Sequence, residues 1–284
     1  MRLAGTPLRA YSTTLAAAVG LGSAGRSLAD ASIYEGWNYP AGDSFDLSPG
    51  TGTGWATDSG YSGPLAVVSP SLTHPAAPPP TGNALGTTAG TSVIDIGRSF
   101  ASSLDSTQTL WMSFLGRRDS DFATYTVSLS QHSGNRTFSA IFGIDVDPSD
   151  GADRYKARWQ NVGFSVTSGD SFASQPLSEP GTTDLFLVRI NAADTVADSQ
   201  TFDMWVNPNA GALGSPDASI TWPSSLRVWS GAQFDANGGT LDEFRIDASM
   251  ANVVSVPAPG AIAAGPLVAL AIARRRRRMR RQPA

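Results

Sequence analysis

The sequence contains no cysteine among its 284 residues. Thiol nucleophiles, zinc-thiolate sites and iron-sulfur clusters are therefore excluded, because each of them needs cysteine sulfur. Disulfide bonds are excluded for the same reason. With 41% hydrophobic residues, a chain of this length can bury a large core and needs no covalent cross-link.

Glutamate is also scarce. The chain has three: Glu35, Glu179 and Glu243. Glycosidases need two carboxylates held on either side of the scissile bond. The nearest carboxylate-rich strand covers residues 241–247, where strict alternation places Glu243 on the same face as Leu241 and Arg245. Phe244 then points into the core, so we interpret this segment as a terminal core strand and expect no catalytic residues in it.

Basic residues are scarce except at the two ends of the chain. Seven of the 20 lysines and arginines follow Ala273, and three precede Asp30. The part between them has a net charge of about −14, against −4 for the whole chain. So acidic a body repels phosphate groups, and we therefore expect no nucleic-acid partner.

Residues 1–31 have the three parts of an export signal. Arg2 and Arg9 give a positive start, residues 15–21 form a short apolar stretch, and 29–31 read as an A-x-A-like cleavage site. We predict a signal peptide over 1–31 and a mature chain that begins near Ser32. The alternative is an amino terminus without regular structure.

The C-terminal segment, residues 253–284, joins an apolar stretch to a basic end. Residues 261–273 are uncharged, but thirteen residues are few for a membrane-spanning helix. Residues 274–278 are five consecutive arginines, which cannot enter a protein core and mark the cytoplasmic side of a membrane segment. We therefore expect this segment to hold the chain at the inner membrane temporarily, with the body outside.

The residues before this apolar stretch resemble a known sorting signal. Val256, Pro257, Ala258 and Pro259, followed by the apolar stretch and the arginine cluster, resemble the PEP-CTERM signal of exopolysaccharide-forming bacteria. Ala258 stands where the name-giving motif has glutamate. The resemblance implies an exosortase-like sorting enzyme as a partner. It also implies a destination in the cell envelope, at the cell surface or in the extracellular matrix.

Residues 32–252 show the pattern of a strand-rich body. Short segments rich in β-branched and aromatic residues are separated by clusters of glycine, proline, asparagine and aspartate. Residues 123–130 are apolar at every second position, which is typical of a strand with one wet face. We predict an all-β antiparallel sandwich in which residues 69–90 form a long surface loop. The predicted strands are 92–96, 109–115, 123–130, 137–145, 154–160, 184–190, 201–206, 226–229 and 241–246.

Several of these segments are similar to segments of exported proteins with a concanavalin A-like, LamG-type jelly roll. They read YEGWNYPAG at 34–42, LWMSFL at 110–115, LVRI at 187–190, WVNP at 205–208 and LDEFRI at 241–246. The resemblance implies one jelly-roll domain of two curved antiparallel sheets over residues 32–252. Such a fold hosts carbohydrate-binding modules, glycosidases and lyases alike, so it does not fix the function.

The acidic segment 145–153 is a candidate calcium site. Ca²⁺ prefers carboxylate oxygens, and Gly151 allows the sharp turn that a binding loop needs. The four carboxylates belong to Asp145, Asp147, Asp150 and Asp153. Their spacing departs from the EF-hand pattern. The alternative, which we favour, is a plain β-hairpin with Asp150 and Gly151 at its turn.

Aromatic residues in turn-like sequence are candidates for carbohydrate binding. An exposed aromatic face can stack on the apolar face of a sugar ring. The candidates lie in glycine-rich sequence, where they could be exposed: Trp37, Tyr39, Trp55 and Tyr61. The alternative, which we favour for each of them, is that the ring packs within the fold.

Taken together, these features predict an exported, envelope- or matrix-associated β-sandwich without enzymatic activity. Its role is structural or is the binding of extracellular polysaccharide. The alternative is a polysaccharide-active glycosidase or lyase of the same fold.

Overall fold

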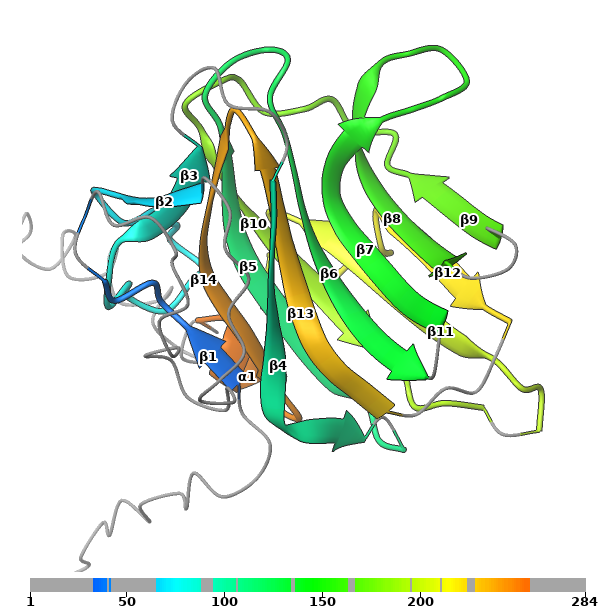
Figure 1. Ribbon diagram of the computed structural model, residues 1–284. Coiled ribbons are helices and arrows are strands. Elements are labelled where there is room, and N and C mark those ends of the chain that lie inside the picture. Colours follow the sequence, from blue (N-terminus) through cyan, green and yellow to red (C-terminus); the bar gives the residue numbers. More distant parts are fainter. Residues whose placement is uncertain are drawn as a thin grey trace, which may run out of the picture.

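The computed structural model describes residues 33–39, 41, 65–87, 94–105, 107–133, 136–162, 167–194, 196–209, 211–223 and 228–255. These residues form two antiparallel β-sheets that pack face to face (Figure 1). The prediction of an all-β antiparallel sandwich is confirmed. The predicted signal peptide, Trp55, Tyr61 and the motif at 256–259 lie outside the described residues. Within these residues, no helix has the length and apolar character needed to cross a membrane.

One sheet has six strands, and each of them pairs antiparallel with its neighbours. In spatial order they are β4 (Ile94–Asp105), β13 (Val228–Asn237), β6 (Thr124–Ser133), β7 (Arg136–Val146), β8 (Asp153–Val162) and β9 (Thr167–Phe172).

The other sheet has eight strands. Seven follow in the order β12 (Ala218–Trp222), β11 (Gln200–Val206), β10 (Thr183–Ile190), β5 (Leu110–Arg118), β14 (Gly239–Asp247), β3 (Ala84–Thr87) and β2 (Leu65–Val68). The eighth, β1 (Ile33–Glu35), pairs with β14 beyond the end of β3. A short helix, α1 (Met250–Val253), follows β14.

The main core lies between the two sheets. In β6, Tyr125, Val127 and Leu129 point into it, as the alternation in the sequence predicts. From the opposite sheet, Phe186 stacks on Phe114 with their ring centroids 4.5 Å apart. The edges of two tyrosine rings also pack on Phe186, so this ring lies at the centre of an aromatic cluster.

A second apolar cluster covers the outer face of the eight-stranded sheet. Leu115 of β5 and Leu187 of β10 point outward into it, which is why these strands are apolar on both faces. The segment 69–83 and helix α1 supply covering side chains, among them Leu72 and Val253. The segment predicted as a surface loop is thus partly a packed layer, and it also contains strand β3.

Strand β14 is interrupted by a β-bulge. Its register against β5 shifts between Asp242 and Arg245, and Glu243 has a left-handed φ of 50°. The extra residue reverses the alternation, so that Leu241 and Phe244 both enter the core. The prediction that Leu241 shares a face with Glu243 and Arg245 is therefore wrong.

Candidate functional site

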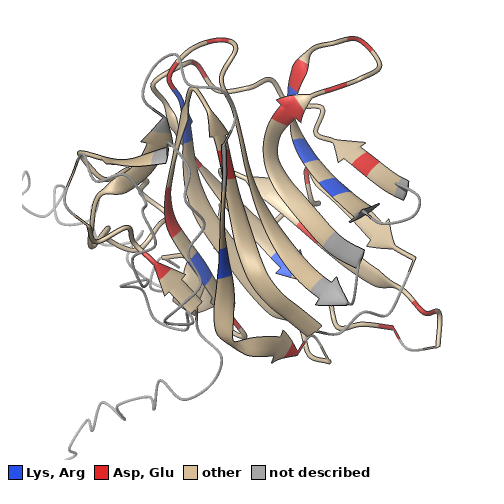
Figure 2. Ribbon diagram, viewed as in Figure 1, with Lys and Arg blue, Asp and Glu red and all other residues tan. Residues whose placement is uncertain are grey.

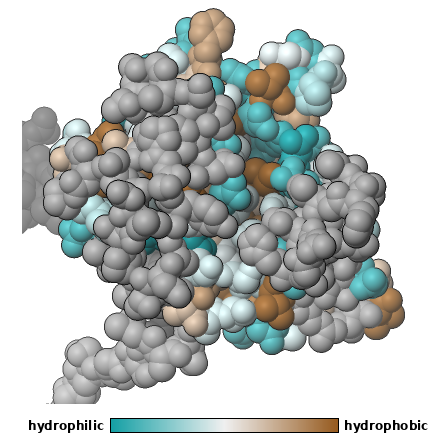
Figure 3. All heavy atoms as spheres, viewed as in Figure 1, coloured by the Kyte–Doolittle hydropathy of each residue, from teal (hydrophilic) through white to brown (hydrophobic). Residues whose placement is uncertain are grey.

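A polar groove of about 360 Å³ lies on the outer face of the six-stranded sheet. Its lining residues alternate with core residues along the same strands: Ser128 lies between Val127 and Leu129 on β6. Figure 3 shows hydrophilic side chains gathered over part of this face, with single hydrophobic ones among them. The groove is thus built from the wet side of strands whose other side forms the core.

Strand register brings the lining residues of different strands into rows. Gln233 of β13 pairs with Ser128 of β6, which pairs with Ile141 of β7, and Ile141 pairs with Arg158 of β8. A parallel row places Ser139 beside Gln160. Neighbouring strands lie about 4.8 Å apart, so a row over these four strands extends about 14 Å. That length suits a chain-like ligand laid across the strands.

A glycine keeps the floor of the groove low. Gly143 on β7 has a φ of 147°, and a Cβ atom there would lie 2.2 Å from the carbonyl oxygen of Tyr125. Only glycine fits this position, because any other side chain would collide with the backbone of β6. The surface beside Thr126 is therefore hollowed.

The charged residues of this face lie mostly in pairs. The Arg158 guanidinium donates to Asp170 at 2.6 Å, and the Lys156 ammonium donates to Asp145. Figure 2 shows the resulting pattern, with basic bands on β8 and acidic residues at the β7–β8 connection and on β9. Most of the charge is thus already neutralised, and the groove presents chiefly hydroxyl and amide groups.

The acidic segment forms a β-hairpin, as favoured from the sequence. Val146 at the end of β7 pairs with Asp153 at the start of β8. Gly151 has a φ of 74°, and its N–H donates to the carbonyl oxygen of Asp147 at 2.8 Å. The Asp150 carboxylate accepts from the N–H of Ala152, which helps to hold its pKa below the usual range. The hairpin prediction is confirmed.

These carboxylates already have partners within the protein. Asp147 accepts from the N–H and hydroxyl of Ser149, and the Arg154 guanidinium lies near both Asp147 and Asp150. Burial raises the pKa of Asp153. Within the described part of the chain, no group of three or more potential ligands is placed to hold a metal. A calcium ion here would have to displace Arg154, and the site remains a prediction.

Of the predicted carbohydrate-binding aromatics, Trp37 is fully buried. Its ring meets the edge of Phe234 at 5.0 Å, and the Arg98 guanidinium lies over it at 5.8 Å. Packing within the fold, the alternative favoured from the sequence, is therefore observed for Trp37. Tyr39 is half-buried and accepts a hydrogen bond from Arg98. Both residues are thus tied to the core rather than to the groove.

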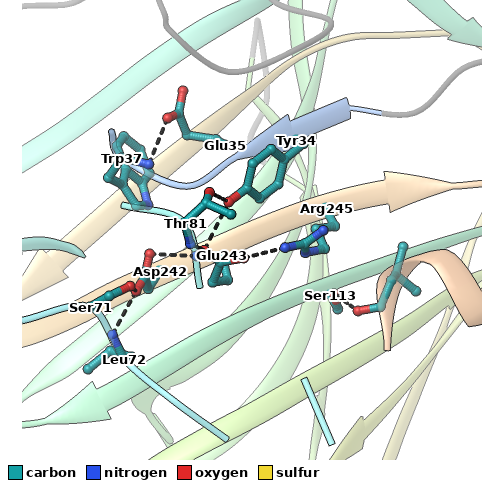
Figure 4. A network of polar contacts seen from close by, with 11 residues as sticks. Tyr34, Glu35, Trp37, Ser71, Leu72, Thr81, Ser113, Asp242, Glu243 and Arg245 are labelled. Atoms are coloured by element: carbon teal, nitrogen blue, oxygen red, sulfur yellow. Dashed lines mark hydrogen bonds and ion pairs between the residues drawn. The ribbon is translucent and has the colours of Figure 1, made fainter. Parts of the chain in front are cut away.

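A second polar cluster surrounds the bulge of β14 (Figure 4). The Asp242 carboxylate accepts from the Ser71 hydroxyl at 2.5 Å and from the N–H of Leu72 at 2.7 Å. Glu243 accepts from the Tyr34 hydroxyl at 3.0 Å and from the N–H of Thr81 at 3.1 Å. The two carboxylates thus fasten the two ends of the segment 71–81 to β14.

This cluster is buried rather than open. Asp242 and Glu243 are 1% and 2% exposed. The pKa of Asp242 is raised to about 7, chiefly by burial and also by the charge of Glu243, although the hydrogen bonds from Ser71 and Leu72 lower it. Burial is also the main reason that the pKa of Tyr34 rises to about 12. We interpret the cluster as a structural clamp, because no substrate could reach its carboxylates without displacing the segment 71–81.

The groove residues were not identified from the sequence. Ser128, Ser139, Gln160 and Gln233 are common polar residues on three successive strands and on β13, which is distant in the chain. The one available signal was the alternation at 123–130, whose polar positions mark a wet face. Joining this face to those of the other strands needs their register, which the sequence does not show.

No protein-family model and no curated protein matches the sequence. Solved structures with a similar fold include the CBM2 module of the evolved Dit of Lactobacillus casei BL23 phage J-1, at 7% identity and a TM-score of 0.38. That match covers 66% of this chain and 82% of the module. Alginate lyase Aly36B matches at 11% identity and a TM-score of 0.43, over 76% of this chain and 96% of the lyase. The exoplasmic/lumenal domain of VIP36, in its Ca²⁺/Man3GlcNAc-bound form, matches at 6% identity and a TM-score of 0.32, over 62% of this chain and 82% of the domain.

Proposed function

We propose that this protein binds extracellular polysaccharide in the groove of the six-stranded sheet and does not cleave it. The observation that carries the proposal is the groove itself, a hollow lined by hydroxyl, amide and paired charged groups on rigid strands. Sugars present many hydroxyl groups, each of which can donate and accept a hydrogen bond. Ile141, half-exposed in the middle of the groove, offers an apolar contact for the C–H face of a ring.

The charge of the groove favours a neutral polysaccharide over a polyanion. Arg158 and Lys156 are paired with Asp170 and Asp145, and Asp235 adds a further carboxylate to the lining. A polyanion would have to compete with these carboxylates for the two cations. A neutral chain can instead hydrogen-bond to both members of each pair.

The lining supports binding rather than turnover. The titratable residues among the described residues of the groove lining are Asp145, Arg158, Asp235 and the buried Tyr125. A glycosidase needs one carboxyl group as acid and another as nucleophile or base, whereas Asp145 is already bound by Lys156. None of the described lining residues is a histidine or glutamate that could serve as a general base.

We also propose that the chain is exported and held at the cell envelope through its C-terminal segment, where an exosortase-like enzyme acts on it. The described chain ends on the outer face of the eight-stranded sheet, where the Ser255 N–H donates to Ala76 at 2.9 Å. This face lies opposite the groove, so attachment there leaves the groove accessible. Intact-mass measurement of protein recovered from cells should show the loss of residues 1–31 and of a C-terminal portion. A mass equal to that of the whole sequence would contradict export processing.

Replacing Gln160 and Gln233 by alanine together should weaken polysaccharide binding about tenfold or more. Each amide lost removes hydrogen bonds worth about 0.5–1.5 kcal/mol, and 1.4 kcal/mol is a factor of ten in affinity. Affinity electrophoresis in gels that contain a neutral β-glucan, mannan or galactan, with alginate as the acidic comparison, measures retention.

Thr221→Ala is the matched control, because Thr221 is exposed on β12 of the other sheet. It should leave retention unchanged. Equal retention of the double variant and the wild type would contradict binding in the groove. Release of reducing ends or unsaturated uronide from any of these polysaccharides would instead support the enzymatic alternative.

A further inference from the structure

The connection between β5 and β6 exposes a phenylalanine almost completely. Phe122 is 87% exposed, although large apolar side chains are commonly buried. Hydrogen bonds hold the backbone on both sides of Phe122. The Ala123 N–H donates to the carbonyl oxygen of Ser120 at 3.2 Å, and the Arg118 guanidinium donates to the carbonyl oxygen of Asp121 at 3.1 Å. The ring therefore contributes no packing to the fold, yet it is held at a defined place.

The anchoring of this connection extends to the neighbouring strands. The Asp119 N–H donates to the carbonyl oxygen of Gly238 at 3.2 Å, and the Thr240 hydroxyl donates to the Asp119 carboxylate at 3.1 Å. These contacts join the connection to the junction of β13 and β14. An exposed ring on so well-anchored a segment is already organised for contact with a ligand.

Phe122 lies at one end of the groove. The groove lining begins at Thr124, two residues after it, and includes Asp145 near the end of β7. The next residue, Val146, alternates to the other side of β7. Val146 is 44% exposed at the start of the β7–β8 connection. Because β6 and β7 are antiparallel, the start of one lies beside the end of the other, and Figure 1 shows both connections at the same end of the sandwich.

Other exposed apolar side chains lie away from the groove. Of the large hydrophobic side chains exposed in the described residues, the remaining two are Val196 and Val228. Val196 follows β10, and Val228 pairs with Asp105 at the far end of β13. The exposed ring of Phe122 therefore lies next to the groove, whereas the exposed side chains of Val196 and Val228 do not.

We propose that Phe122 forms an apolar extension of the groove that binds additional sugar residues of a polysaccharide chain. This inference rests on the proposed function. The groove supplies hydrogen bonds for one stretch of the chain, and the apolar extension packs against the C–H faces of rings that continue past its end. The ligand is then a chain of several sugar residues that continues beyond the groove, rather than a monosaccharide or a short chain end.

The test uses neutral oligosaccharides of graded length from a polysaccharide that the wild-type protein retains. Calorimetric titration should show that Phe122→Ala weakens binding of the longest oligosaccharides about three- to tenfold and leaves the shortest unchanged. Phe122→Trp should keep or improve the affinity for long chains, because a larger ring offers more stacking surface. The melting temperature of both variants should equal that of the wild type, since Phe122 makes no core contact.

The outcomes separate this inference from the proposed function. If Phe122→Ala binds all lengths as the wild type does, while the Gln160 and Gln233 variant binds all lengths more weakly, the extension is contradicted and the groove remains. If Phe122→Ala instead abolishes self-association in sedimentation velocity, the ring contacts a second copy of the chain and the inference is overturned. If the wild type binds no polysaccharide, the proposed function and this inference are both contradicted.

Discussion

Glu35→Ala is expected to lower the free energy of unfolding by about 3–5 kcal/mol. Glu35 and Arg98 form an ion pair at 2.5 Å, with 0% and 2% of their side chains exposed. The second carboxylate oxygen of Glu35 accepts from the Trp37 N–H at 2.9 Å. Removing the carboxylate leaves a buried guanidinium without its counter-ion and a buried amide without its acceptor. At about 2–4 °C per kcal/mol, the melting temperature should fall by roughly 10 °C.

Urea denaturation followed by tryptophan fluorescence measures this loss, and a double variant provides the control. Glu35→Leu combined with Arg98→Met removes both charges and keeps similar volumes, so it should recover most of the stability. The single changes Glu35→Leu and Arg98→Met and the double change form a cycle that isolates the coupling between the pair. A loss below about 1 kcal/mol for Glu35→Ala would show that water reaches Arg98 and that the pair is not a buried one.

Several strands of the sandwich could be predicted from local sequence, although the predicted segments 92–96 and 226–229 cover only the first residues of β4 and β13. Residues 123–130 alternate between apolar and polar side chains, and the observed strand β6 covers Thr124–Ser133. The β7–β8 hairpin was predictable because Asp150 and Gly151 stand between two strand-like segments. In both cases the pattern is contained within one continuous stretch of sequence. It can therefore be recognised without knowing which other parts of the molecule pack against that stretch.

Some short strands, such as β9 at a sheet edge and β3 between β14 and β2, could not be predicted in this way. Strand β9 reads TSGDSF, which has neither apolar alternation nor β-branched enrichment, and β3 reads ALGT next to a proline-rich segment. Each is a strand because a neighbour offers it backbone hydrogen bonds: β8 for β9, and β14 for β3. Their conformation is decided by tertiary contacts, which override local propensity.

The candidate site shows the same limit. Trp37 lies in glycine-rich sequence, which correctly indicates a turn but says nothing about what packs against it. The bulge at Glu243 puts Leu241 on the core side together with Phe244 and Ile246, against the strict alternation that was predicted, because an extra residue changes the phase between the side chains before and after it. The groove depends on the register of four strands. Its residues could be recognised as polar, but not as neighbours.

The stability of the sandwich is expected to fall as the pH rises from about 4 to 7, through the clamp that Asp242 makes on the segment 71–81. The pKa of Asp242 is raised from 3.8 in the unfolded chain to about 7 in the folded protein. In this window the folded state holds a proton that the unfolded state has released, so each unit of pH disfavours folding. The stabilisation is complete below pH 4 and is lost above pH 7. At 1.36 kcal/mol per pKa unit, the loss is at most about 4 kcal/mol.

Asp242→Asn isolates this contribution, because asparagine carries no charge at any of these pH values. Its carbonyl oxygen can still accept from Ser71 and Leu72, whereas its amide faces the N–H of Glu243 as a second donor, which adds a cost that does not change with pH. Burial lowers the pKa of His74, so His74 affects stability in the opposite direction near pH 6, equally in both proteins. The stability difference between the variant and the wild type should therefore shift in favour of the variant between pH 5 and pH 8. Parallel curves over that range would show that Asp242 is ionised throughout and that its hydrogen bonds outweigh its burial.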